Sequence, residues 1–161
     1  RELGDVRAFI SQLRPPMLDQ LGLDGAIEDT VDHMRTLTGL DITTNLDGST
    51  LTLTDGQRTV ALRVAQEALQ NVRKHAAASH AVVATHHDDA GVWILEVRDD
   101  GRGFDVGAVA ARGRRNFGLQ FMRERAELIG ARFDVRSRTN GGTIVRLSIP
   151  PQDASGGEES T

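Results

Sequence analysis

Apolar side chains recur at three- and four-residue steps in four stretches of the chain, which is the spacing of one face of an α-helix. The first stretch, residues 3–13, has no capping residue before it and is followed by Pro15 and Pro16. We therefore expect the chain to begin within a helix whose upstream part is missing and which stops at the prolines. The other stretches predict helices at about residues 23–38, 56–77 and 117–129, with Asp55 as the N-cap of the middle one.

Apolar and polar residues alternate between these helices, as they do in half-buried strands. Turn sequences such as Asp47-Gly48 and Thr139-Asn140-Gly141 divide the alternating stretches into hairpins. The predicted strand pairs are residues 40–46 with 50–53, 80–87 with 91–98, and 131–138 with 142–149. Helices and hairpins in this order predict an α+β fold: a two-layer α/β sandwich whose helices cover one face of a mixed, mostly antiparallel sheet.

Composition narrows the classes of function. The chain has 161 residues, a formal net charge of −4 and no cysteine, so we expect one domain without disulfides or a thiolate metal site. Nucleic acid is not an expected partner, because its binding needs a basic face or stacked aromatic rings.

Residues 104–116 carry glycine, arginine and small residues without a helical or strand periodicity and are predicted as a mobile loop. Residues 151–161 are predicted as a disordered tail.

Residues 66–75, QEALQNVRKH, place three chemically different side chains on one predicted helix. Because residues three and four apart share a helix face, Glu67, Asn71 and Lys74 are expected to project together. Hard cations such as Mg²⁺ take oxygen ligands, and a lysine ammonium supplies a point charge for phosphate. The pattern indicates a nucleotide-binding face, and a solvated helix side with ordinary charges is the alternative.

A second motif, VRDDGRGFD at residues 97–105, lies where a predicted strand ends. Gly101 and Gly103 lack a Cβ, so the backbone can turn sharply and approach a flat ligand. Asp99 can accept a hydrogen bond from an exocyclic amine such as adenine N6. These features are typical of an adenine pocket. For this stretch taken alone, a surface turn rich in Asp and Gly is the alternative interpretation.

A third motif, RNFGL at residues 115–119, leads into the last predicted helix. The N–H groups at a helix N-terminus suit a phosphate, and Gly118 permits its close approach. Arg112, Arg114 and Arg115 could close over phosphates or simply keep a loop soluble. A plain helix start is the alternative for this stretch.

Taken in this order, the three motifs resemble the nucleotide-binding fold shared by gyrase B, Hsp90, MutL and the sensor histidine kinases. QEALQNVRKHA, DDGRGF and FGLQFMRERAELIG are most similar to the catalytic ATP-binding domain of two-component histidine kinases of the NarX, DegS and DesK type. The resemblance covers about residues 14–150 and includes LRPPMLDQLGL near its start. It implies a dimerisation and phosphoacceptor hairpin ending with its linker at residues 1–16, an ATP-binding domain at 17–150 and an ATP lid at about 104–117.

The resemblance also implies ATP and Mg²⁺ as cofactors, and it implies which residues contact the adenine base. By position, Asp99 would read adenine, Gly101 and Gly103 would shape its pocket, and Phe104 would belong to the same nucleotide-binding set. On the phosphate side, Gly118 and Leu119 would form a second box, with Arg115 beside it. Asn116 departs from the glycine found in many relatives, which puts the form of the lid in question.

On the helix, the resemblance implies that Asn71 coordinates Mg²⁺, that Lys74 meets phosphate and that His75 lines the pocket. Glu67 matches the acid that activates water in the hydrolysing relatives, and in a kinase it would polarise the acceptor histidine or organise the metal's water shell. Glu67, Asn71 and Lys74 are therefore the expected catalytic residues.

No histidine of the sequence is identified as the phosphoryl acceptor, and His33 in particular does not fit the acceptor pattern. The spacing of His80, His86 and His87 does not indicate a metal site either. The acceptor is therefore expected on the chain's own upstream dimerisation domain, with a response regulator as the indirect partner. We expect this chain to be a cytoplasmic monomer that binds ATP without phosphorylating itself, within a homodimeric parent that is membrane-anchored or soluble. The alternatives are an ATPase or conformational switch of the gyrase, MutL or Hsp90 kind, a serine kinase of the anti-sigma-factor type, and a nucleotide-sensing module without catalysis.

Overall fold

A single five-stranded sheet organises the chain. In the computed structural model, which describes residues 15–48, 52–111 and 118–151, the strand order is β1-β2-β3-β5-β4. β1 and β2 run parallel, while the other neighbouring pairs are antiparallel, so the predicted mixed, mostly antiparallel sheet is confirmed. The strands are β1 (Asp41–Asn45), β2 (His80–His87), β3 (Trp93–Asp99), β4 (Arg132–Ser137) and β5 (Thr143–Ile149).

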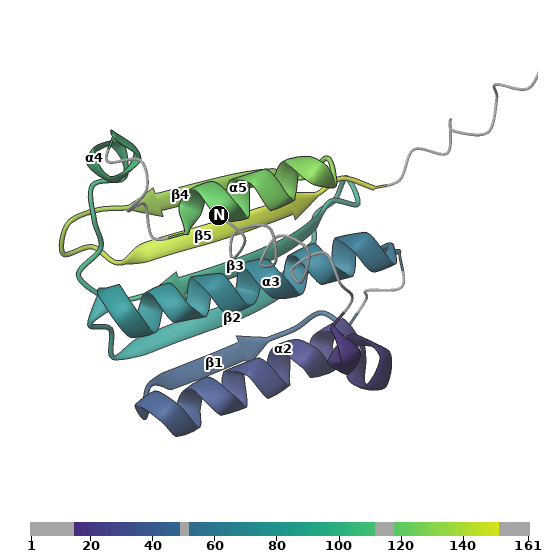
Figure 1. The fold of residues 1–161 in the computed structure, drawn as a ribbon, viewed down its shortest axis with the longest axis horizontal. Helices are drawn as coiled ribbons and strands as arrows, with labels where there is room; N and C mark the ends of the chain where they lie inside the picture. The colour runs from purple at the N-terminus through teal and green to yellow at the C-terminus, as the bar shows by residue number, and fades with distance from the viewer. Residues whose placement is uncertain (1–14, 49–51, 112–117, 152–161) are drawn as a thin grey trace, which may run out of the picture.

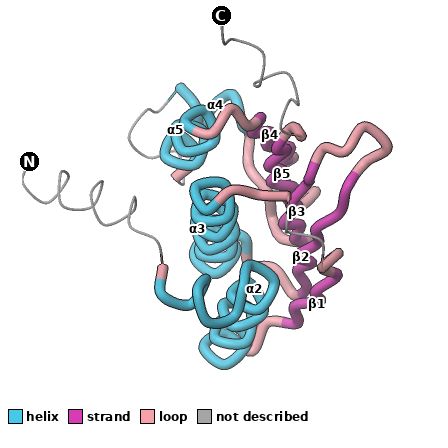
Figure 2. The backbone as a smooth tube through the Cα atoms, turned by 90° about the vertical axis from the view of Figure 1, so that its right-hand side faces the viewer, coloured by secondary structure: helices cyan, strands magenta, loops and turns pink. Residues whose placement is uncertain are grey.

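Helices form the second layer. Figure 2 shows α2, α3 and α5 on one side of the sheet, which confirms the two-layer α/β sandwich. α3 leads without a break into a π-helical turn, labelled η1. The helical elements are α2 (Pro16–Thr38), α3 (Asp55–Asn71), η1 (Val72–Ala76), α4 (Val106–Ala111) and α5 (Leu119–Leu128).

Strand alternation decides which side chains meet the helices. Trp93, Leu95 and Val97 of β3 point into the core, where they are at most 2% exposed. Asp99 comes two residues after Val97 and therefore points to the same side of the sheet, at the end of the strand. Figure 1 shows the end of β3, the C-terminal end of α3 and the β4–β5 turn at one end of the sandwich. The packing of the core thus directs an acidic side chain toward the end of α3.

The first part of the fold corrects three predictions. The helix expected at 23–38 begins at Pro16, because proline suits the first helical turn, and it kinks at Gly22, where φ is +70°. Residues 52 and 53 lie in a turn, not in a strand, so the hairpin predicted at Asp47-Gly48 does not form; β1 pairs with the distant β2 instead. Thr54 rather than Asp55 caps α3, because its hydroxyl and the Gln57 side chain form a reciprocal capping box.

Later elements fit the predictions more closely. The hairpins β2–β3 and β4–β5 and the helix α5 are confirmed within a few residues of the expected bounds. The loop predicted at residues 104–116 contains the short helix α4, which lies beside β4 (Figure 1), so that prediction is wrong for this part. The predicted helix at residues 3–13, the rest of the lid and the tail from Gln152 lie outside the described residues. None of the described helices is both long and apolar enough to span a membrane.

Candidate functional site

A cavity of about 200 Å³ lies between the C-terminal end of α3 and strands β3 and β5. This volume is below the roughly 300–1,000 Å³ of pockets that enclose whole drug-sized ligands, and it suits a planar base better than an entire nucleotide. Most of the wall is apolar, with polar groups at a few points. The lining residues are Ala68, Asn71, Val72, His75, Val97, Asp99, Arg102, Gly103, Phe104, Leu119, Thr143 and Val145.

Asp99 supplies the carboxylate of the cavity. Its Oδ1 accepts a hydrogen bond of 2.8 Å from the N–H of Gly101, two residues farther along the turn. Burial raises the pKa of the Asp99 carboxyl; the Gly101 N–H opposes this rise and the charge of Asp100 adds to it. Thr143 is the direct partner of Asp99 across the β3–β5 ladder, so a hydroxyl stands beside the carboxylate in the same wall. A base entering here would meet two groups able to accept hydrogen bonds.

The β4–β5 turn holds the segment that follows Asp99. The N–H of Gly142 donates to the carbonyl oxygen of Gly101 at 3.0 Å, and the N–H of Asn140 donates to that of Arg102 at 2.5 Å. Gly103 has a φ of +59°, and a Cβ on it would overlap the carbonyl oxygen of Arg138. The predicted need for glycine at position 103 therefore has two physical causes, a left-handed backbone and close contact with the neighbouring hairpin.

The helical wall of the cavity bears Asn71 and His75. The predicted α-helix over 56–77 is α-helical only to Asn71, and the π-helical turn after it follows a wider i→i+5 pattern. His75 lines the cavity, whereas Lys74 is exposed and does not. Burial lowers the pKa of His75, and the positive charges of Lys74 and Arg102 lower it further, so the imidazole is neutral at neutral pH. The Nε of Arg102 also donates to the His75 carbonyl oxygen at 2.6 Å.

Glu67 lies one helical turn before Asn71 and contacts the start of α5. A Cβ on Gly118, whose φ is +72°, would overlap the Glu67 carboxylate. Leu119, the first residue of α5, is 7% exposed and lines the cavity. The helix motif and the glycine-bearing helix start, 51 positions apart in the sequence, therefore meet beside the cavity.

The structure brings together most of the residues that the sequence singled out. Of the predicted set, the residues that line the cavity are Asn71, His75, Asp99, Gly103, Phe104 and Leu119. Glu67, Lys74, Gly101 and Gly118 do not line it, and Arg115 lies outside the described residues.

Sequence reasoning missed two polar lining residues, Arg102 and Thr143. Arg102 sits inside the quoted glycine motif and could have been selected from it. Thr143 follows the Gly141-Gly142 turn by one position, but only the β3–β5 register places it opposite Asp99.

The resemblance implies a magnesium ion, and the donor chemistry of Asn71 fits one. Its amide oxygen is a hard ligand at the cavity wall, and Mg²⁺ characteristically binds few protein groups while retaining water and substrate phosphates. Within residues 15–48, 52–111 and 118–151, no group of three or more His, Cys, Asp or Glu side chains has the arrangement of a metal site. An ion held by Asn71 would therefore need phosphate and water for its other positions.

Comparison with known proteins supports the motif analysis. Residues 56–153 match the protein family described as histidine kinase-, DNA gyrase B-, and HSP90-like ATPase. The chain is 32% identical over 148 residues to the signal transduction histidine-protein kinase/phosphatase DegS of Brevibacillus brevis, covering 92% of this chain and 37% of that protein. It is 35% identical over 153 residues to the oxygen sensor histidine kinase NreB of Staphylococcus carnosus, covering 95% and 43%. The chain thus spans less than half the length of these relatives.

Solved structures share the fold. The histidine kinase domain of the blue-light activated histidine kinase EL346 from Erythrobacter litoralis superposes with a TM-score of 0.64 at 19% identity, covering 78% of this chain and 59% of that one. The histidine kinase AdeS of Acinetobacter baumannii gives a TM-score of 0.66 at 14% identity, covering 81% and 65%. At these identities the likeness concerns the fold alone.

Proposed function

The chain belongs to the family of histidine kinase-, DNA gyrase B- and HSP90-like ATPases, and from this premise we propose that it is the catalytic ATP-binding domain of a sensor histidine kinase. It binds Mg·ATP and presents the γ-phosphoryl group to a histidine on an upstream dimerisation domain. The relatives over most of this chain's length are sensor histidine kinases, which favours a protein histidine as the acceptor. The observation that carries the proposal is the cavity that joins Asp99 to the Asn71 wall of α3.

Adenine occupies the cavity in this proposal. The apolar side chains of Val97 and Val145, which are neighbours on one side of the sheet, pack against the base, and the Asp99 carboxylate accepts a hydrogen bond from its exocyclic amine. The Thr143 hydroxyl offers a second polar contact beside that carboxylate. The half-buried Asp99 carboxylate selects a base with a donor at this point, because a base with an acceptor there would leave a carboxylate oxygen without a hydrogen bond.

The phosphates extend from the cavity past the end of α3. Asn71 would hold the magnesium ion, whose positive charge would neutralise the phosphate oxygens, and Lys74 adds a cation at the exposed surface. Gly118 brings the start of α5 close to Glu67 without a side chain between them. Residues 104–117 are proposed as the lid over the phosphates, with Arg115 in it.

Phosphoryl transfer needs positioning more than covalent chemistry from the protein. An imidazole nitrogen of the acceptor forms the new N–P bond, the bond between the γ-phosphorus and the bridging oxygen breaks, and ADP leaves with that oxygen. In this proposal Glu67, one turn before Asn71 on the same helix, orients the acceptor imidazole or the water around the metal. A response regulator then takes the phosphoryl group on an aspartate, and the parent protein acts as a homodimer.

Calorimetric titration of the 161-residue chain with ADP and ATP, with and without Mg²⁺, tests the binding part of the proposal. Binding of both nucleotides, tighter for ATP when Mg²⁺ is present, is the expected result. Absence of binding by the folded protein would refute it. Restoring the upstream helical domain should then yield phosphohistidine, whereas rapid ATP hydrolysis by this chain alone, abolished by Glu67→Gln, would favour a self-sufficient ATPase instead.

A further inference from the structure

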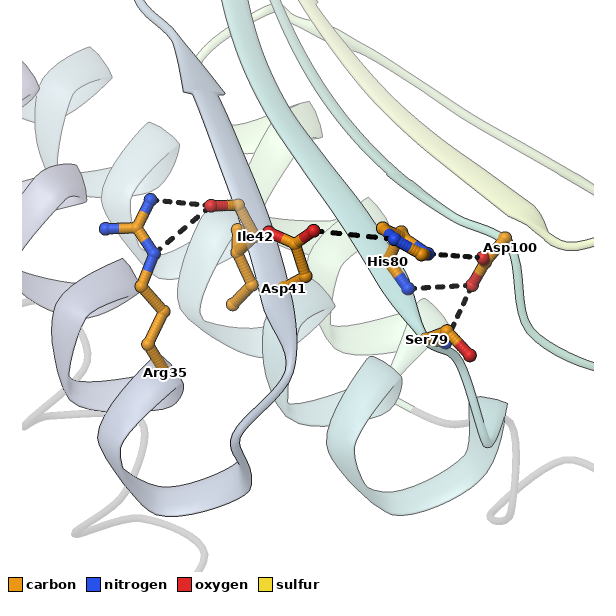
Figure 3. A network of polar contacts seen from close by, with 6 residues as sticks. All are labelled: Arg35, Asp41, Ile42, Ser79, His80 and Asp100. Atoms are coloured by element: carbon orange, nitrogen blue, oxygen red, sulfur yellow. Dashed lines mark hydrogen bonds and ion pairs between the residues drawn. The ribbon is translucent and has the colours of Figure 1, made fainter.

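Asp100, next to Asp99, directs its carboxylate away from the cavity to Ser79 and His80, at the start of β2. Its Oδ1 accepts hydrogen bonds from the N–H groups of Ser79 at 2.8 Å and His80 at 2.9 Å. Its Oδ2 lies 3.1 Å from Nδ1 of the His80 ring, and its own N–H donates to the His80 carbonyl oxygen at 3.2 Å. Figure 3 shows this cluster at the end of the sheet.

The segment that binds Asp100, Ser79 and His80, is itself held by β1 and α2. Nε2 of His80 lies 3.4 Å from an Asp41 oxygen on β1, and the Asp41 N–H donates to the Ser79 carbonyl oxygen at 3.4 Å. The Arg35 guanidinium of α2 donates twice to the Ile42 carbonyl oxygen, at 3.1 and 2.6 Å (Figure 3). The carboxylate of Asp100 is thus attached to a frame formed by two strands and a helix.

The direct chain connection between Asp99 and Asp100 links this attachment to the cavity. Asp99 is the last residue of β3, so the hydrogen bonds that hold Asp100 also restrain the backbone from which the Asp99 side chain projects. The Gly101 side of the turn is held separately by Gly142 of the β4–β5 hairpin. The segment that carries Asp99 is therefore held from two sides, and Asp100 is the side-chain attachment to β2.

Electrostatics agrees with this geometry. The N–H groups of His80 and Ser79 lower the pKa of the Asp100 carboxyl, with a further contribution from the His80 side chain, so the acceptor is ionised at neutral pH. Asp100 is exposed and contributes nothing to the buried core, so its hydrogen bonds are its contribution to the fold.

We propose that Asp100 is a positioning residue for base recognition: by tying the turn to Ser79 and His80 it sets the direction of the Asp99 carboxylate and hence the preference for adenine over a purine without an exocyclic amine. This inference rests on the proposed function, because it assigns Asp99 to the base.

Titration of the chain with ADP and with inosine diphosphate tests the proposal. Hypoxanthine has a carbonyl oxygen where adenine has its amine, so the ratio of the two dissociation constants reports on Asp99. The unaltered protein should prefer ADP by about 10- to 100-fold, the range expected for one hydrogen bond to a charged group. Asp100→Ala should reduce that ratio by about 3-fold or more, while Asp100→Asn, whose amide oxygen can still accept both backbone hydrogen bonds, should keep most of it.

Asp88→Ala is the matched control. Asp88 also accepts two backbone N–H bonds, from Ala90 and Val92 at 2.9 Å each, but at the opposite end of the same hairpin. Its loss should leave the nucleotide ratio unchanged.

Three outcomes separate the possibilities. If Asp100→Ala weakens both nucleotides equally, or behaves as Asp88→Ala does, the role is merely structural and the inference is overturned while the proposed function stands. If Asp100→Ala does not fold, Asp100→Glu decides, because it keeps the charge but displaces the oxygens by one methylene; an unchanged ratio there also overturns the inference. If the unaltered chain binds neither nucleotide, the proposed function fails and the inference fails with it.

Discussion

Gly142 lies directly against the backbone of Asp99, so that the first carbon of any side chain at position 142 would overlap the Asp99 carbonyl oxygen. The contact joins the β4–β5 turn to the end of β3, where Asp99 carries the carboxylate that is proposed to bind the base. Because Gly142 also donates its N–H to Gly101, the hairpin turn supports the whole glycine segment. A glycine far from the nucleotide motifs in the sequence is therefore part of the site's geometry.

Gly142→Ala should lower both the free energy of unfolding and nucleotide affinity. Alanine at a φ of +76° costs about 1–2 kcal/mol, and the overlap with Asp99 adds about 1–3 kcal/mol. Gly130→Ala is the control, since its φ is +65° with no atom within 4 Å of a new Cβ. Urea unfolding and ADP titration of both variants measure the difference. Equal losses in the two would mean that only backbone conformation matters at position 142.

Asp99→Asn should weaken ADP binding by about 1–3 kcal/mol, the usual loss for a hydrogen bond to a buried charge. The nucleotide-free protein should be at least as stable as before at neutral pH, because the raised pKa of Asp99 shows that its charged form is penalised by burial. Calorimetry and urea unfolding measure the two effects. Unchanged affinity would remove Asp99 from the base-binding role.

The pH dependence of Asp99 has a definite sign. Its folded pKa is raised above the ordinary 3.8, so its contribution to stability is fully present below that value and is lost as pH rises through the folded pKa. The difference in unfolding free energy between the unaltered protein and Asp99→Asn should therefore favour the unaltered protein more at low pH. ADP affinity should change in the opposite direction, falling as the carboxylate takes up a proton. A pH-independent difference between the two proteins would contradict this account.

Asn71→Ala should impair nucleotide binding mainly when Mg²⁺ is present, because the amide oxygen is proposed as a metal ligand. ATP titrations with Mg²⁺ and with a chelator, on the variant and the unaltered chain, measure the two losses. Gln70→Ala is a suitable control, since Gln70 precedes Asn71 on the same helix, bonds to Arg73 and does not line the cavity. The same loss with and without Mg²⁺ would show that Asn71 acts only on the shape of the pocket.

Glu96→Gln should destabilise the fold without changing the cavity. Glu96 is 3% exposed on the open face of the sheet, where Arg98 and Arg146 hold it between two guanidinium groups. Burial alone would raise the pKa of Glu96, but the hydrogen bonds and charges of the two arginines outweigh it and hold the pKa low. The stabilisation is therefore present above the ordinary value of 4.5 and is lost as pH falls through the folded pKa.

At neutral pH the expected cost is about 1–3 kcal/mol, below that of a fully buried ion pair because both arginines reach water. Asp134→Asn is the control, since its ion pair with Arg132 is largely exposed and should contribute at most about 1 kcal/mol. Urea unfolding at several pH values distinguishes them. Equal costs for the two variants, or a Glu96 cost that is the same at pH 3 and pH 7, would contradict the assigned role.

The sequence was informative wherever the signal is local. Periodicity located α5 and most of α3, and the Asn140-Gly141 turn located the β4–β5 hairpin, because such elements depend on side chains a few positions apart. It failed at the strand predicted for residues 50–53, where Leu53 is apolar because it is buried before α3 and not because it alternates in a sheet. The π-helical turn after Asn71 also gave no signal, since no spacing rule separates it from the end of an α-helix.

The sequence alone determined the chemical inventory of the site: an acid followed by two glycines at a strand end, an amide and a histidine on a helix, and a glycine at a helix start. Only the tertiary structure decided which of these groups share a cavity. It placed His75 rather than Lys74 in the wall of the cavity, and it brought Thr143 and Gly142 next to Asp99 through the pairing of β3 with β5. The physical reason is that residue type and short-range spacing are properties of the chain, whereas register between distant strands is set by the packing of the whole core.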